Sequence, residues 1–140
     1  MPGPSPQRVL EEALSLARLH QARLERISRS EKQSRARFEV LVAMGGGQTV
    51  PTIARRMGLT RQSVQRIADL LAEARLARFE ANPDHRRSPI LTPTEEGRRL
   101  RERLDRQLRD WAGSVEELVE PEDFETALVV LRAIRSGLER

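Results

Sequence analysis

The sequence of 140 residues contains no cysteine and very few aromatic side chains. Without cysteine, disulfide bonds, thiolate zinc sites and thiol-based redox switching are all excluded. Tyrosine is also absent, and one tryptophan and three phenylalanines make up the whole aromatic content. A hydrophobic core must therefore be built from leucine, isoleucine, valine and alanine, and this composition favours helices.

Long apolar segments and addressing signals are lacking as well. No apolar run approaches the roughly 20 residues that a membrane span requires. Residues 1–6 are rich in proline, glycine and serine and are too short and polar for a signal peptide. Only two histidines occur, His20 and His85, so a metal site would need carboxylates for nearly every ligand. We therefore expect a cytoplasmic protein without metal or cofactor, with a disordered tail over residues 1–7.

The positive charge is concentrated in one part of the chain. Lysine plus arginine number 25 against 21 acidic residues, which gives a formal net charge of +4. The window 49–90 holds eight arginines and four acids and so accounts for the whole excess. A localised basic surface is what phosphate binding requires, although a charge of this size is weak evidence by itself. The preference for arginine over lysine is explained most simply by a GC-rich genome.

Periodicity and capping residues predict a mainly α-helical chain with one small hairpin. Helices are expected over residues 8–28, 31–44, 50–57 and 60–74, then from Thr92 or Thr94 to about Val119, and over 121–139. The glycines at 45–47 should end the second of these helices, because glycine adopts the left-handed geometry of helix ends. Alternation over 76–80 and 88–91, around turn residues at 82–84, predicts a two-stranded hairpin.

The segment Thr49–Ile67 has the pattern of a helix-turn-helix. Ala54 is small where two helices cross closely, and Gly58 takes the turn between them. Leu59 and Val64 are expected to pack inward and hold the second helix against the first. The alternative is a plain helical hairpin with a solvated polar face. It would account for each polar residue taken singly, but it does not explain why Ala54, Gly58, Thr60 and Val64 occur in this order and at this spacing.

The second helix of this motif is the expected DNA-reading element. Thr60 caps its N-terminus, where unpaired N–H groups and the positive end of the helix dipole favour phosphate. Its buried face is expected to hold Val64, Ile67, Leu70 and Leu71. The exposed face then presents polar side chains that can reach a duplex, namely Arg61, Gln62, Ser63, Gln65 and Arg66.

From about Phe38 to Leu100 the chain resembles the MarR family of winged helix-turn-helix regulators. The matching pieces are the helix-turn-helix segment, the run 82–88, and Leu91-Thr92 followed by Gly97. The resemblance implies a mainly α winged helix-turn-helix fold with N- and C-terminal dimerisation helices and one two-stranded wing. It also implies a bacterial homodimer whose recognition helices enter successive major grooves while the wings reach the flanking minor grooves.

The resemblance assigns roles to two residues of the wing. Asp84 and Arg86 fall on an acidic-x-Arg pattern in which the acid orients the arginine. The recognition helix and the wing together give the predicted DNA contacts, which are Thr60, Arg61, Gln62, Ser63, Gln65, Arg66, His85, Arg86 and Arg87. In two departures from the family pattern, Phe79 replaces a common wing arginine and Arg75 stands where a glycine usually ends the recognition helix. An arginine in left-handed geometry costs about 1 kcal/mol. The sequence therefore does not determine the geometry of the helix–wing junction.

The terminal helices, 8–30 and 112–140, carry apolar faces that one small domain cannot cover. A two-fold homodimer would cover them, and residues 31–111 would form the DNA-binding lobe with its long connecting helix. Half-sites would then lie about 10 base pairs apart in a pseudo-palindromic operator. The predicted dimer contacts are Leu10, Ala13, Ala17, His20, Leu24, Phe124, Leu128, Leu131, Ile134 and Leu138.

These observations predict a sequence-specific, duplex-DNA-binding transcriptional regulator, a repressor that responds to a small molecule. The effector is an expectation of the resemblance alone, and the sequence identifies neither it nor the target genes. No nucleophile elbow, phosphate loop or metal-ligand spacing is visible, so an enzyme is not expected. The alternative is a helical protein–protein adaptor on a winged-helix scaffold that does not bind DNA, because a fold does not determine a function.

Overall fold

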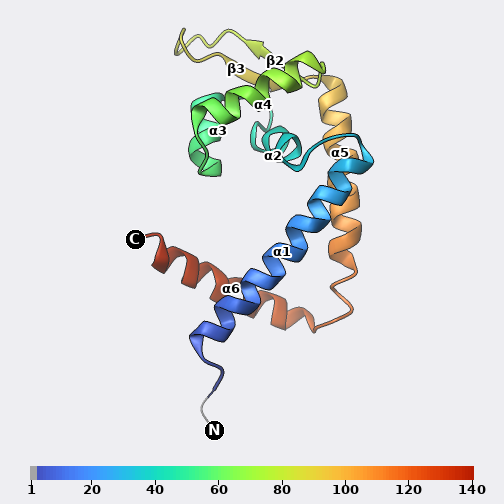
Figure 1. Cartoon of the computed structure of the whole chain (residues 1–140), viewed down its shortest axis with the longest axis vertical. Helices are drawn as coiled ribbons and strands as arrows, with labels where there is room; N and C mark the ends of the chain where they lie inside the picture. Colours follow the sequence, from blue (N-terminus) through green and yellow to red (C-terminus); the bar gives the residue numbers. More distant parts are fainter. Residues whose placement is uncertain (1–2) are drawn as a thin grey trace. The chain divides into compact units, whose positions relative to one another are not determined.

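The chain folds into a mainly helical structure with one small antiparallel sheet (Figure 1). It is described by a computed structural model over residues 3–140. Contacts divide it into two units, one that extends to Asp105 and the other Arg106–Arg140. The elements are α1 (Pro6–Ser30), α2 (Arg35–Ala43), β1 (Gln48–Thr49), α3 (Val50–Met57), α4 (Arg61–Glu73), β2 (Ala77–Glu80), β3 (Ile90–Pro93), α5 (Glu95–Gly113) and α6 (Pro121–Leu138).

Hydroxyl side chains begin five of the helices. Ser5, Ser34, Thr49, Thr60 and Thr94 each accept a hydrogen bond from the backbone N–H three residues further on. The caps predicted at Thr49 and Thr60 are thereby confirmed. Such a cap satisfies an N–H group that has no partner inside the helix, which is why the helices begin at these positions.

The cap at Ser5 corrects the expected disordered tail. Helix α1 starts at Pro6, so residues 6 and 7 are helical, because proline in the first turn needs no N–H partner. Met1 and Pro2, which the same prediction covered, lie outside the described residues. The cap at Ser34 likewise moves the start of the second helix from the predicted residue 31 to Arg35.

The core lies in the first unit, between α2, α3, α4, the sheet and the beginning of α5. Its largest fully buried side chains are Leu41, Met44, Ile53, Leu71, Leu91 and Leu104. Helix α4 contributes Val64, Ala68 and Leu71, which follow the spacing of one helical face.

Two leucines of the helix-turn-helix are more exposed than predicted. Leu70 is 36% exposed, because Ala68 and not Leu70 lies on the same face as Val64 and Leu71. Leu59 is 44% exposed, so it does not pack inward. Its backbone N–H instead closes the end of α3 by donating to the carbonyl of Ala54 at 2.9 Å. Backbone capping at the turn, and not side-chain packing by Leu59, therefore ends this helix.

The predicted hairpin is present, and a third strand joins it. Strand β3 pairs antiparallel with β2 on one side and with β1 on the other, which gives the order β1-β3-β2. The two residues of β1 pair with Leu91 and Ile90. A strand of two residues is too short to show alternation, so sequence periodicity could not reveal it.

The second unit contains the end of α5 and helix α6. Helix α5 ends at Gly113, earlier than the predicted Val119, and residues 114–118 form turns. The Ser114 hydroxyl donates to the carbonyl of Trp111 at 2.6 Å, which offers the backbone an alternative to further helix. Helix α6 buries none of its residues within the chain. None of the helices in residues 3–140 combines the length and apolar character needed to cross a membrane.

Candidate nucleic-acid interface

The first two turns of α4 present the predicted reading residues to solvent. Arg61, Gln62, Ser63, Gln65 and Arg66 are all exposed, while Val64 between them is completely buried. The helix is therefore fixed to the core on one side and free on the other. This arrangement leaves several hydrogen-bonding side chains available on the solvent-facing side of α4.

Thr60 and Ser63 form a compact cap at the beginning of this face. The Thr60 hydroxyl accepts from the backbone N–H of Ser63 at 3.1 Å and donates to the Ser63 hydroxyl at 2.8 Å. Both side chains thus already have partners within the chain. These hydrogen bonds hold the N-terminus of α4 in place. A contact of either side chain with phosphate would be a second role.

A hollow of about 310 Å³ joins α4 to the base of the wing. Three reading residues and one wing arginine line it together. The lining comprises Val50, Pro51, Arg61, Gln62, Gln65, Arg87, Ser88 and Pro89. Residues that are far apart in the sequence therefore share one concave surface with two guanidinium groups.

The tip of the wing is organised by Asn82. Its amide donates to the carbonyl of Ser88 at 3.0 Å, and its side-chain oxygen accepts from the N–H of Asp84 at 3.1 Å. The sequence marked Asn82 as a turn residue but did not identify this cross-loop bond. Asn82 thus closes the loop that carries His85 and the two following arginines, all of which are exposed.

The predicted partnership between Asp84 and Arg86 does not form in the chain alone. Of the ion pairs within residues 3–140, none involves either side chain. On the neighbouring strand, Arg78 instead pairs with Glu80 at 2.9 Å. Arg86 is therefore left free for an external partner, and its orientation by Asp84 stays a prediction.

Comparison with known proteins identifies the family of the chain. A model of the MarR family matches residues 34–88, from the cap of α2 to the end of the wing loop. Over 134 residues the chain is 35% identical to an uncharacterized protein of Mycobacterium tuberculosis, covering 95% of this chain and 89% of that relative. The chain belongs to the MarR family.

Solved MarR structures share the fold over almost the whole chain. The crystal structure of the MarR family transcription regulator SP03579 has a TM-score of 0.88 at 19% identity and covers 95% of this chain and 89% of its own. A mutant of Escherichia coli MarR complexed with operator DNA has a TM-score of 0.79 at 14% identity, with 91% and 93% covered. These structures show that the chain has the winged-helix fold of the MarR type.

The junction between α4 and the wing keeps the geometry typical of a glycine despite Arg75. This residue has a φ of 59°, in the left-handed region. Its N–H donates to the carbonyl of Ala72, and the N–H of Leu76 donates to that of Leu71 at 2.9 Å. These two bonds form a Schellman motif, with the accompanying apolar pair Leu71 and Leu76 both buried. The helix therefore ends as a glycine would end it, at the cost of backbone strain.

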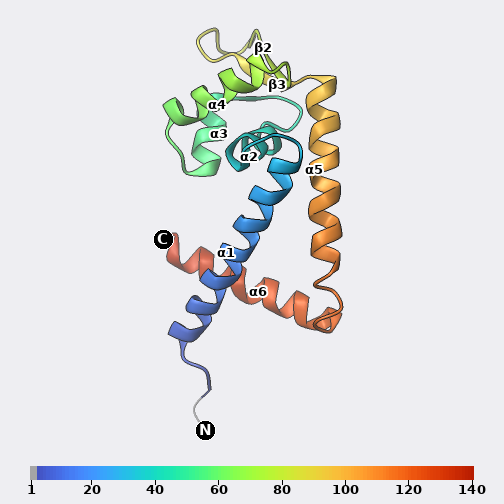
Figure 2. The same ribbon diagram turned by 45° about the vertical axis from the view of Figure 1, so that its right-hand side comes forward.

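Two hydrogen bonds and one close approach hold this strained turn against the start of α5. Figure 2 shows that α5 begins where strand β3 ends. The Thr94 hydroxyl donates to the carbonyl of Arg75 at 2.7 Å and accepts from the N–H of Gly97. The N–H of Thr94 donates to the carbonyl of Leu76. Gly97 lies so close to Leu76 that an added Cβ would collide with its carbonyl oxygen. The recognition helix, wing and α5 are thus joined at one point.

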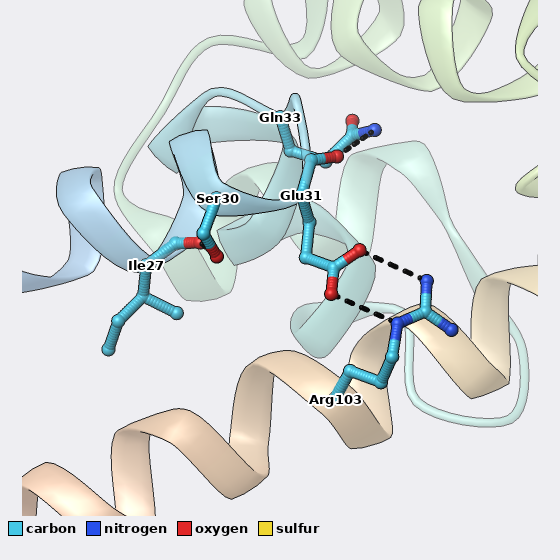
Figure 3. A network of polar contacts seen from close by, with 5 residues as sticks. All are labelled: Ile27, Ser30, Glu31, Gln33 and Arg103. Atoms are coloured by element: carbon cyan, nitrogen blue, oxygen red, sulfur yellow. Dashed lines mark hydrogen bonds and ion pairs between the residues drawn. The ribbon is translucent and has the colours of Figure 1, made fainter.

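A bidentate ion pair holds α5 against the end of α1 (Figure 3). The guanidinium of Arg103 donates to both carboxylate oxygens of Glu31, at 3.0 and 3.1 Å. Hydrogen bonding to Glu31 raises the pKa of Arg103 above its ordinary value. Two residues earlier, Arg101 donates to the carbonyl of Gly45 at 2.9 Å. Sequence reasoning missed both contacts, since they join residues far apart in the chain.

Among residues 3–140 there is no cluster of three or more histidine, cysteine or acidic side chains that would hold a metal ion. His85 lies on the wing, in the first unit, and His20 lies on α1.

Proposed function

We propose that this MarR family protein is a homodimeric repressor that binds duplex DNA in a sequence-specific manner. Helix α4 would lie in the major groove and the wing in the flanking minor groove. The observation that carries the proposal is the shared hollow, in which Arg61, Gln62 and Gln65 of α4 meet Arg87 of the wing. The operator complex of the Escherichia coli neighbour supports the same use of the fold.

The residues divide into two kinds of contact. Arg61, Gln62, Gln65 and Arg66 carry the donors and acceptors that read base edges. The wing residues His85, Arg86 and Arg87 are suited to phosphate and sugar contacts, which position the protein without reading sequence. The remaining predicted contacts, Thr60 and Ser63, would add the capped helix end to a phosphate.

Dimerisation is proposed from the open apolar faces of the terminal helices. Phe124, Leu128 and Leu131 on α6 are 37, 47 and 48% exposed, and Leu10 on α1 is 49% exposed. Leu24 is already buried in the first unit, so we leave it out of the interface. Ala13, Ala17, His20, Ile134 and Leu138 remain in it. A two-fold pairing of these faces would remove the apolar surface from water.

Response to a small molecule is the least developed part of the proposal. It is supported by membership of the family and by a hollow of about 430 Å³ where α1 ends and α2 begins. A volume of this size is within the range of small-molecule sites. Glu25, Arg29 and Arg35 among its lining residues would favour a polar effector over an apolar one.

The test is a titration with duplex DNA from the region upstream of the protein's own gene, in which a pseudo-palindromic operator is first sought. Arg61→Ala should cost about 1–3 kcal/mol on this duplex, because a bidentate base contact is lost. Arg86→Ala should weaken binding to all duplexes alike and reduce the slope of log K against log salt by about 1. Arg99→Ala, which removes an arginine paired with Glu95 on α5, is the control and should change neither.

A random-sequence duplex at two salt concentrations decides against the adaptor alternative. A DNA-binding protein should bind it weakly and with a steep dependence on salt, since phosphate contacts release counterions. Absence of any salt-dependent binding would contradict the proposed function.

A further inference from the structure

Gln65 on the reading face is held by an acidic neighbour one turn along α4. Its side-chain Nε2 donates to Oδ1 of Asp69 at 2.9 Å, and both residues are exposed. Gln65 also lines the hollow between α4 and the wing. An acid on this face is unexpected, because a carboxylate near a duplex is repelled by phosphate.

The chemistry of the pair determines how the Gln65 amide is turned. A carboxylate only accepts hydrogen bonds, so the NH₂ group must be the end of the amide that faces Asp69. One N–H is used in this bond. The carbonyl oxygen Oε1 and the second N–H are left for an outside partner, as one acceptor beside one donor.

One acceptor beside one donor matches adenine in the major groove. Adenine presents an N6 amino donor next to the N7 acceptor, whereas guanine presents the two acceptors O6 and N7. A glutamine that rotates freely can turn its NH₂ toward guanine. A glutamine whose NH₂ is held by a carboxylate would instead place its oxygen against the guanine acceptor.

We propose that Asp69 is a positioning residue that orients the Gln65 amide and thereby makes the protein prefer adenine over guanine at one position of each half-site. The inference rests on the proposed DNA-binding function and concerns the same surface. Asp69 touches no base itself. It lowers general affinity through its charge and increases discrimination through its hydrogen bond.

The experiment measures the affinity of the full-length protein for a panel of operator duplexes in which each half-site base pair is changed singly. The position at which Gln65→Ala loses its preference defines the Gln65 contact. At that position the wild type should favour adenine over guanine by about tenfold. Asp69→Ala should reduce this ratio to about twofold or less, and it should have no further effect in the Gln65→Ala background.

Two further variants separate orientation from charge. Asp69→Asn removes the charge and supplies an amide that can either donate to Gln65 or accept from it, so the Gln65 amide is no longer turned one way. The adenine preference should therefore fall toward that of Asp69→Ala while the affinity for every duplex rises. Glu73→Ala removes the same charge from α4 at a residue that does not bond to Gln65. It should strengthen binding to all duplexes without changing the adenine-to-guanine ratio.

The outcomes distinguish this inference from the proposed function. If the wild type binds no duplex in the panel with any preference, the proposed function itself is overturned. If the wild type discriminates but Asp69→Ala keeps the same ratio as Glu73→Ala, only the role of Asp69 is overturned. Thermal unfolding of each variant confirms that the compared proteins are folded.

Discussion

The two units of the molecule bury their apolar side chains to very different extents. Every buried hydrophobic side chain of residues 3–140 lies in the first unit, from Leu24 to Leu104. In the second unit no side chain of α6 is buried, and Val129 is 61% exposed. Because hydrophobic stabilisation follows the apolar area removed from water, the first unit is stabilised by its own core, whereas the apolar side chains of α6 are not buried within the chain.

The sequences of the helices account for this difference. In α4, one stripe of Val64, Ala68 and Leu71 faces the core and polar residues cover the rest. In α6 the run 127–131 is apolar at every position, so apolar side chains point in several directions around the helix. A helix that is apolar around most of its circumference is typical of a buried environment. The proposed dimer would supply such an environment for α6.

The largest expected effect comes from truncating matched leucines in the two units. Leu71→Ala should lower the free energy of unfolding by about 2–5 kcal/mol, because Leu71 is fully buried. Leu128→Ala should act on association instead, raising the dimer dissociation constant roughly tenfold. Chemical denaturation at several protein concentrations separates the two. If Leu128→Ala is as costly as Leu71→Ala at the lowest concentration, the contrast between the units is wrong.

A matched pair of glycines should give effects of opposite sign. Gly97→Ala should cost roughly 3 kcal/mol or more, because the new Cβ meets the Leu76 carbonyl, which the Thr94 bonds hold in place. Gly137→Ala on α6 meets nothing within 4 Å and should gain up to about 1 kcal/mol from helix propensity. Thermal unfolding of both variants checks this, and a neutral Gly97→Ala would show that the junction can relax.

The smallest expected effect is a gain at the strained turn of the first unit. Arg75→Gly should stabilise the protein by up to about 1 kcal/mol, since glycine adopts a φ of 59° without strain. Ala74→Gly, at a φ of −77°, is the control and should destabilise slightly. Equilibrium denaturation measures both. A loss of stability in Arg75→Gly would mean that the arginine side chain contributes more than its backbone strain costs.

Local features of the fold could be predicted from the sequence, because their causes lie within a few residues. The caps at Thr49 and Thr60, the turn at Gly58 and the hairpin around Asn82 are all determined by neighbours along the chain. The exposed reading face followed from helical periodicity, whereas the exposure of Leu59 and Leu70 did not. Both leucines fit an apolar pattern, but Leu70 lies off the face that holds Val64, Ala68 and Leu71, and Leu59 lies at the turn that ends α3.

The sequence by itself determined that this protein is a winged helix-turn-helix of the MarR family, and it predicted a reading helix that carries Arg61 and Arg66. The tertiary structure decided how that helix is held. Arg75 lies in a left-handed turn that residues about twenty positions later hold in place. Thr94 donates to the carbonyl of Arg75, and Gly97 packs against Leu76. The same long-range packing brings Arg87 beside Arg61 in one hollow. Such contacts depend on how separate elements meet in space, and local propensities contain no information about that.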